Sequence, residues 1–149
     1  MFLDPQELNT VIYEYQLQQI VESNNTIVAT AILAAELEVK SYLTPSNLPL
    51  RSKTVPKYDT KHIFEAVGQD RNPLILLHVK NVAVWHLITL SNADIIFEHV
   101  RQRYDRSIDY LKKIASGELT LNLPLLAPEE ENPDLNQFHF GSNKKFNHE

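Results

Sequence analysis

The sequence predicts an all-α fold of four or five helices, with a short β element and an extended C-terminal arm. Two long segments, 73–90 and 94–116, are apolar nearly throughout or apolar at helical spacing. Asp4-Pro5 and Asn72-Pro73 each place a capping side chain before a first-turn proline, which is typical of helix starts. The chain has 149 residues, 43% of them apolar, and this suits one compact domain over residues 1–123.

The first 43 residues are predicted to form three helices. A short helix capped by Asp4 reaches about residue 12, and a second helix follows over 14–22. Thr26 is predicted to cap a longer, alanine-rich helix that ends at Leu43, shortly before a proline. Its expected apolar face consists of Ile27, Ala31, Ala34 or Ala35, Leu37 or Glu38, and Tyr42.

Residues 44–72 are predicted to form a long loop that binds a partner. This segment contains three prolines and few helix signals, and loops longer than about 12 to 15 residues usually bind something. Residues 62–67 are apolar enough to pack as a short strand or turn, and we expect Ile63 and Phe64 to contact a partner. The alternative interpretation is a surface loop that binds no partner.

Residues 73–90 are predicted to form a buried central helix. Twelve of these eighteen residues are apolar, so the helix has little purely polar face and belongs inside the domain or against a neighbouring subunit. Spanning a bilayer takes about 20 mostly apolar residues, and polar side chains interrupt this run. The interrupting residues are His78, Lys80, Asn81 and His86. We therefore expect no membrane anchor.

The longest helix is predicted to begin at Asn92 or Asp94 and to end near residue 116, with Gly117 as its left-handed C-cap. Its apolar residues recur every three or four positions, and charged residues occupy the remaining surface. The apolar set is Ile96, Val100, Tyr104, Ile108, Leu111 and Ala115. Alternating leucines then predict a short strand over 119–123, which a proline ends.

Residues 124–149 are predicted to be an extended arm. The segment is rich in proline, asparagine and glutamate and has too little apolar surface to fold alone. Phe138, Phe140 and Phe146 are spaced among polar residues, and aromatic anchors in a polar arm bury large areas on a partner. We expect these three side chains to contact neighbouring subunits or a partner protein. A disordered arm with incidental aromatics is the alternative.

Composition argues against most enzymatic and nucleic-acid-binding classes. The chain has no cysteine and three widely separated glycines, which excludes thiol chemistry and the glycine-rich phosphate-binding loops. Its net charge of −5 has the wrong sign for a protein that holds DNA by its phosphates. The histidine and carboxylate spacings match no helical metal motif, so we expect no metal, no cofactor and no catalytic residues. The acidic first turn also predicts no secretory signal.

Several packing motifs resemble a known family. The longest helix carries Arg103-Tyr104, then Tyr110-Leu111, a small residue and Gly117 before the alternating leucines. This order resembles the C-terminal helix of the head-completion, or head-to-tail connector, proteins of Mu-like tailed phages. The middle helix around Trp85 and the Tyr42-Leu43 ending of the alanine-rich helix resemble the same family. The match covers about residues 5–43 and 73–123, whereas the 44–72 loop and the arm depart from the family pattern.

The resemblance implies a structural, non-enzymatic protein of the virion neck. Such connectors form a ring, commonly of twelve copies, beneath the portal protein, contact tail or neck proteins, and let DNA pass without sequence-specific binding. The alternatives are a tail-completion or terminator protein, a small helical regulator from a cellular genome, and an enzyme that uses some of the six histidines.

Overall fold

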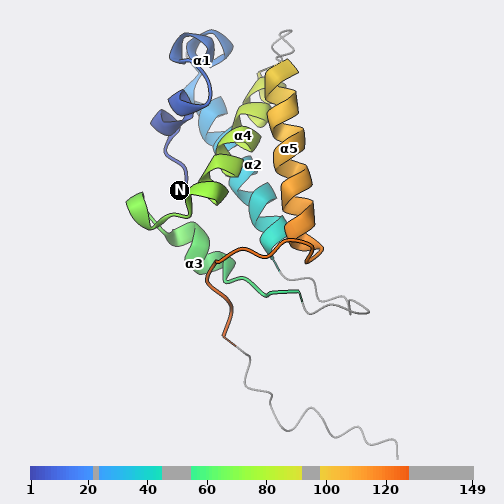
Figure 1. Ribbon diagram of the computed structural model, residues 1–149. Coiled ribbons are helices and arrows are strands. Elements are labelled where there is room, and N and C mark those ends of the chain that lie inside the picture. The colour runs from blue at the N-terminus through green and yellow to red at the C-terminus, as the bar shows by residue number, and fades with distance from the viewer. Residues whose placement is uncertain (22–23, 45–54, 92–97, 128–149) are drawn as a thin grey trace, which may run out of the picture.

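A computed structural model describes residues 1–21, 24–44, 55–91 and 98–127 of the chain. These residues are mostly helical, in agreement with the all-α prediction (Figure 1). In chain order, the elements are the 3-10 helix η1 (Pro5–Thr10), α1 (Glu14–Val21), α2 (Asn25–Leu43), α3 (Thr60–Glu65), the 3-10 helix η2 (Gly68–Asp70), α4 (Pro73–Leu90) and α5 (Glu98–Ala115).

The N-terminal helices follow the prediction closely. Asp4 caps η1 by accepting a hydrogen bond from the Gln6 backbone N–H at 2.9 Å, and the Glu7 carboxylate accepts one from the Asp4 N–H at 3.1 Å. This reciprocal capping box satisfies donors that the first turn would otherwise leave free. The first helix is a 3-10 helix that ends at Thr10, and α1 ends at Val21.

The cap of α2 and one position of its buried face differ from the prediction. Asn24, not Thr26, is the N-cap, and its side chain accepts from the Thr26 N–H at 3.2 Å. The buried positions are Val28, Ala31, Ile32, Ala35, Val39 and Leu43, whereas Leu37 is exposed and Tyr42 is half-buried. Ala31 and Ala35 are buried as predicted and Ile27 packs against the core, but neither Leu37 nor Glu38 is buried. That part of the prediction was wrong because α2 is apolar on two sides, so helical spacing alone does not identify the side covered by α4.

Helix α4 is the central element, as predicted. Asn72 caps it by accepting from the N–H groups of Leu74 and Ile75. It packs mainly against α2 and then against α5, and small residues at Ala31, Ala35 and Ala83 are almost fully buried. By length and composition α4 is apolar enough to cross a membrane, but half of it is buried inside the structure, as in the core helix of a folded domain.

Helix α5 packs against α4, and its described part begins at Glu98. The predicted start at Asn92 or Asp94 lies outside the described residues, as does the predicted apolar residue Ile96. Ile108 and Leu111 are buried as predicted. Ile114 takes the buried position predicted for Ala115, which is exposed. The prediction was wrong by one residue, because the next buried position after Leu111 can lie either three or four residues further along the helix.

A helix occupies part of the predicted 44–72 loop. Residues 60–65 form α3, whereas we predicted a strand or turn around residues 62–67. Asp59 caps this helix by accepting from the His62 N–H at 3.0 Å, and Ile63 is buried in the core. The helix was missed because it is only six residues long, too short to show a periodic pattern. Residues 45–54 of the predicted loop lie outside the described residues.

The predicted strand over 119–123 is not present among the described residues. The alternation itself is real: Leu119 and Leu121 are half-buried and Leu123 is buried, while the residues between them are exposed. Just beyond, an isolated antiparallel bridge pairs Leu125 with Tyr58. The Asp59 N–H donates to the Pro124 carbonyl at 2.9 Å and the Leu126 N–H to the Lys57 carbonyl at 2.8 Å. The first residues of the predicted arm are therefore tied to the segment before α3.

Gly117 ends α5 in the left-handed conformation, with φ of +75°. A Cβ at this position would lie 3.1 Å from Val55 Cγ2. We expect Gly117→Ala to lower the free energy of unfolding by about 1 to 2 kcal/mol, through backbone strain and this crowding. Urea unfolding measures the loss. Gly68 has φ of +59° but open space around its Cα, so Gly68→Ala should cost less; an equal cost would contradict a role for Val55.

Candidate functional site

Of the five residues predicted to contact a partner, the structure describes the two on α3. Phe138, Phe140 and Phe146 lie outside the described residues. Ile63 is 4% exposed in the core, and the Phe64 ring packs on the Phe2 ring with centroids 5.0 Å apart. Ile63 and Phe64 of α3 therefore both pack against other residues of the same chain. Contacts of these residues with another protein stay a prediction.

Of the residues that carried the family resemblance, the structure brings two together. The rings of Trp85 and Tyr104 stack with centroids 5.1 Å apart, which joins α4 to α5. Leu43 and Leu111 are core residues, Tyr42 packs against the core, and Gly117 caps α5. Arg103 points elsewhere, toward the N-terminal helices.

A carboxylate on α2 completes the contact between Trp85 and Tyr104. Glu38 accepts a hydrogen bond from the Tyr104 hydroxyl at 2.9 Å, and its other oxygen lies 2.6 Å from Nε2 of His86. Burial, together with the Glu38 carboxylate, raises the pKa of Tyr104 to about 12, so the hydroxyl stays protonated and donates. The cluster fixes α2, α4 and α5 relative to one another.

His78 on α4 is buried against an aromatic ring. It is 7% exposed, and its ring stacks on Tyr110 of α5 with centroids 4.8 Å apart. Within the described part of the chain, neither ring nitrogen has a hydrogen-bond partner. Burial lowers the pKa of His78 from its usual 6.5, because the charged ring cannot be solvated there.

We expect that, in His78→Phe, the free energy of unfolding decreases less between pH 7 and pH 5 than it does in the native protein. In the native protein, the unfolded chain binds a proton at this histidine more readily than the folded chain, so the free energy of unfolding falls as pH drops below 6.5. Phenylalanine keeps the stack on Tyr110 and does not titrate. Urea unfolding between pH 7 and pH 5 measures the slope. The exposed His62→Gln should retain the native slope, and a native slope in His78→Phe would contradict the assignment.

Helix α2 exposes a second apolar side. Leu33 and Leu37, one turn apart, are 54% and 59% exposed. We call this pair the α2 leucine strip. Four residues of separation place the two side chains on one face, so they form a continuous apolar surface that nothing in the described chain covers. The strip was not predicted, because the expected apolar face contained either Leu37 or Glu38 at this position.

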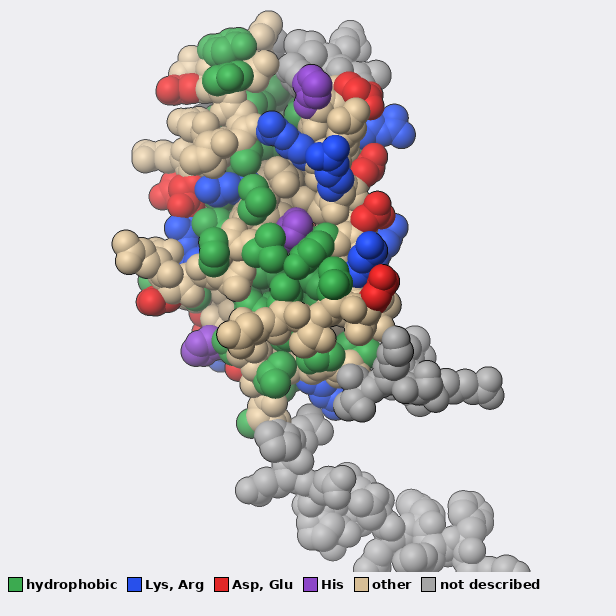
Figure 2. Space-filling model, in the orientation of Figure 1, with side chains coloured by type: hydrophobic (Ala, Val, Ile, Leu, Met, Phe, Trp, Pro, Cys, Tyr) green, Lys and Arg blue, Asp and Glu red, His purple; other side chains and the backbone are tan. Residues whose placement is uncertain are grey.

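Apolar side chains are also exposed on the face of the molecule that carries α4 and α5. Hydrophobic side chains gather in the middle of the face formed by α4 and α5, whereas Lys, Arg, Asp and Glu are interspersed along α5 (Figure 2). One pair on this helix, Arg101 and Asp105, lies 3.9 Å apart. Charges of both signs along one face are typical of a solvated helix surface.

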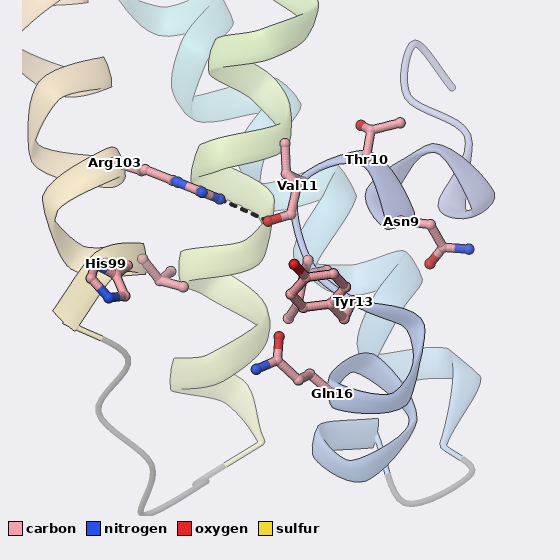
Figure 3. Close-up of a pocket in the computed structure, with 9 residues that line it drawn as sticks. Asn9, Thr10, Val11, Tyr13, Gln16, His99 and Arg103 are labelled. Atoms are coloured by element: carbon pink, nitrogen blue, oxygen red, sulfur yellow. Dashed lines mark hydrogen bonds between the residues drawn. The ribbon is translucent and has the colours of Figure 1, made fainter.

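A groove of about 330 Å³ lies between the N-terminal helices and the first turns of α5 (Figure 3). Arg103 reaches across it, and its Nη1 donates to the Val11 carbonyl at 2.8 Å. We call this the Arg103 groove. Its lining residues are Asn9, Thr10, Val11, Ile12, Tyr13, Gln16, His99, Val100 and Arg103.

Tyr13 lines the Arg103 groove, and Tyr15 stacks on it. Tyr13 and Tyr15 are 70% and 65% exposed, and their rings stack with centroids 5.7 Å apart and 19° between the planes. Tyrosine and arginine are the residues that most often carry the binding energy of protein interfaces. No periodic pattern in the sequence predicts this site, because its residues come from elements far apart in the chain.

Comparison with known protein families identifies a match over most of the chain. A family model described as Bacteriophage Mu, Gp36 matches residues 2–140, which include every helix described above together with Phe138 and Phe140. Searches of curated proteins and of solved structures found no match to the chain.

Proposed function

This chain belongs to the bacteriophage Mu Gp36 family, and we propose that it is the structural head-to-tail connector of a tailed phage. In this role, copies of the chain form a ring, commonly of twelve, beneath the portal protein. The ring continues the DNA channel and joins the capsid to neck or tail proteins. The work is binding, without chemistry or a cofactor.

The α2 leucine strip carries the proposal of a ring. Fully burying one leucine side chain contributes about 1.5 to 3 kcal/mol, so a neighbouring copy that covers both leucines would gain part of this energy from each. Leu33 and Leu37 lie on the side of α2 away from α4, where a neighbouring copy has access to them. A closed ring needs one such patch on each copy to meet a different patch on the next.

The net charge supports passage of DNA through the ring. At −5 per copy, a ring of many copies is strongly anionic. Anionic walls make no favourable contacts with phosphates, so DNA slides along them with little adhesion. Lysine substitutions of the acidic residues that line the channel should slow DNA ejection, and unchanged ejection would contradict this part of the proposal.

Assembly with the portal protein tests the function. The chain is mixed with purified portal from the same phage, and the masses of the complexes are measured by mass photometry. We expect a portal complex that carries a ring of copies of the chain. In the double variant Leu33→Glu with Leu37→Glu, the ring should fail to form, because two carboxylates replace the apolar contact. The exposed pair Gln19→Glu with Gln69→Glu adds the same charge elsewhere and should assemble normally.

Circular dichroism and urea unfolding check that the double variant is folded, which its exposed positions favour. A chain that ignores the portal and binds the end of the tail tube would replace the connector role by that of a tail-completion protein. Equal assembly of both double variants would show that the α2 leucine strip is not the ring contact.

A further inference from the structure

We propose that the Arg103 groove receives the C-terminal segment, residues 128–149, of a second copy of the chain. This inference rests on the proposed function, since a ring brings a second copy within reach. The groove would thus be the binding site of the arm, and its ligand would be a peptide with acidic and aromatic side chains.

The groove offers a cation in a fixed position. The Arg103 guanidinium is held by its bond to the Val11 carbonyl, and its other N–H groups have no hydrogen-bond partner among the described residues. Arginine presents its donors in a planar fork that fits a carboxylate with two parallel hydrogen bonds. His99, one turn earlier on α5, and the amide of Gln16 add further polar groups to the lining.

The groove also offers an aromatic platform. The stacked, exposed rings of Tyr13 and Tyr15 present flat apolar area at the edge of the groove. Aromatic side chains prefer offset or tilted contacts with other rings, and each such contact adds to the burial of area. A ligand that carries phenylalanine near a carboxylate fits both parts of the site.

The C-terminal segment has this chemistry. It contains the acidic run Glu129-Glu130-Glu131 and Asp134, followed by Phe138 and Phe140. The charge is complementary to that of Arg103, and the phenylalanines match the tyrosine pair. At most 3.3 Å per residue, its 22 residues span up to about 73 Å, which exceeds the roughly 27 Å length of α5.

The path of the chain favours a second copy over the same copy. The Tyr58–Leu125 bridge fixes the start of the arm beside α3, at the end of the molecule opposite to α1 (Figure 1). The Arg103 groove lies at the α1 end, against the first turns of α5. The last described residues therefore run away from their own groove. A contact from the end of one copy to the opposite end of the next is head-to-tail, and such contacts form a ring when the rotation between copies closes.

Because the chain has no cysteine, single cysteines can report the contact in the full-length protein. Gln16→Cys places a thiol in the groove, and Ser142→Cys places one in the arm beside Phe140. The two variants are mixed, oxidised and analysed by intact mass. We expect a disulfide-linked heterodimer. Gln69→Cys, exposed on η2, replaces the groove cysteine as the control and should give only background.

Removing the cation tests the specificity of the cross-link. Arg103→Gln, introduced into the Gln16→Cys chain, should lower the yield about tenfold, as expected for the loss of a charge-assisted contact. Arg106→Gln, exposed one turn further along α5, should leave the yield unchanged. Urea unfolding confirms that both variants are folded.

Two results would overturn the proposal. One is a yield no higher than that of the Gln69→Cys control. The other is a disulfide that forms only within one molecule of the double variant Gln16→Cys with Ser142→Cys, which would place the arm in its own groove. The cross-link is measured on the chain alone and again with the portal protein present, because the proposed ring lies beneath the portal. A cross-link without portal binding would therefore count against the connector role alone, and portal binding without a cross-link against the groove alone.

Discussion

Replacing Leu87 with alanine is expected to lower the free energy of unfolding by about 3 kcal/mol, within the range of about 2 to 5 kcal/mol for such truncations. Leu87 is fully buried on α4, the helix that packs against both α2 and α5. Truncation removes apolar contacts and leaves a cavity that rigid helices on both sides cannot fill. Urea unfolding at pH 7 measures the effect.

Leu90 provides the matched control on the same helix. It lies three residues later and is 46% exposed, so the same substitution removes much less buried surface. We expect Leu90→Ala to change the free energy of unfolding by less than about 1 kcal/mol. Equal losses for the two variants would contradict the position of α4 at the centre of the core.

Replacing Glu7 with glutamine is expected to destabilise the fold by about 2 kcal/mol at neutral pH. Arg71, just before α4, holds Glu7 of η1 with two hydrogen bonds of 2.7 Å, and it also donates to the Phe2 carbonyl at 2.8 Å. The two side chains are 13% and 29% exposed, so the pair is partly shielded from water. Glutamine keeps the size of Glu7 but leaves the guanidinium without its charge partner.

The pH dependence of this contribution has a defined sign. The hydrogen bond from Arg71 lowers the pKa of Glu7 from 4.5 to about 2. At about 1.4 kcal/mol per pH unit, this shift is worth about 3 kcal/mol, which partial exposure to solvent reduces to about 2 kcal/mol. The contribution is fully present above pH 4.5 and is lost as the pH falls toward 2. The stability difference between the native chain and Glu7→Gln should therefore disappear in acid.

An exposed ion pair serves as the control for Glu7. Arg101 and Asp105 are 3.9 Å apart and more than half exposed, and such pairs contribute little. At neutral pH and at pH 2, Asp105→Asn should therefore have the same free energy of unfolding as the native chain. A difference between Glu7→Gln and the native chain that persists at pH 2 would mean that the loss does not come from the charge.

The predictions succeeded where a local signal specifies the structure. Asn72-Pro73 and Asp4-Pro5 determine helix starts through side-chain caps, and Gly117 determines a helix end through its backbone conformation. These signals act within a few residues and do not depend on the rest of the fold.

The predictions failed where packing decides between local alternatives. Leu37 and Val39 both suit a buried helix position, and only contact with α4 selects Val39. The alternating leucines over 119–123 form no strand because the described segment lies over the helices instead of pairing with a second strand. The α2 leucine strip and the Arg103 groove depend on the same tertiary choices, so sequence spacing alone does not reveal them.

The central contact between α2 and α4 has a consequence for synthesis of the chain. The buried side of α2 is complete at Leu43, but the helix that covers it ends only at Leu90. At about 5 to 20 residues per second, the ribosome adds the intervening residues in roughly 2 to 10 s. During that interval, both apolar sides of α2 are open to other nascent chains. Chaperone capture of the growing polypeptide should therefore peak before residue 90 emerges and fall once α4 has docked.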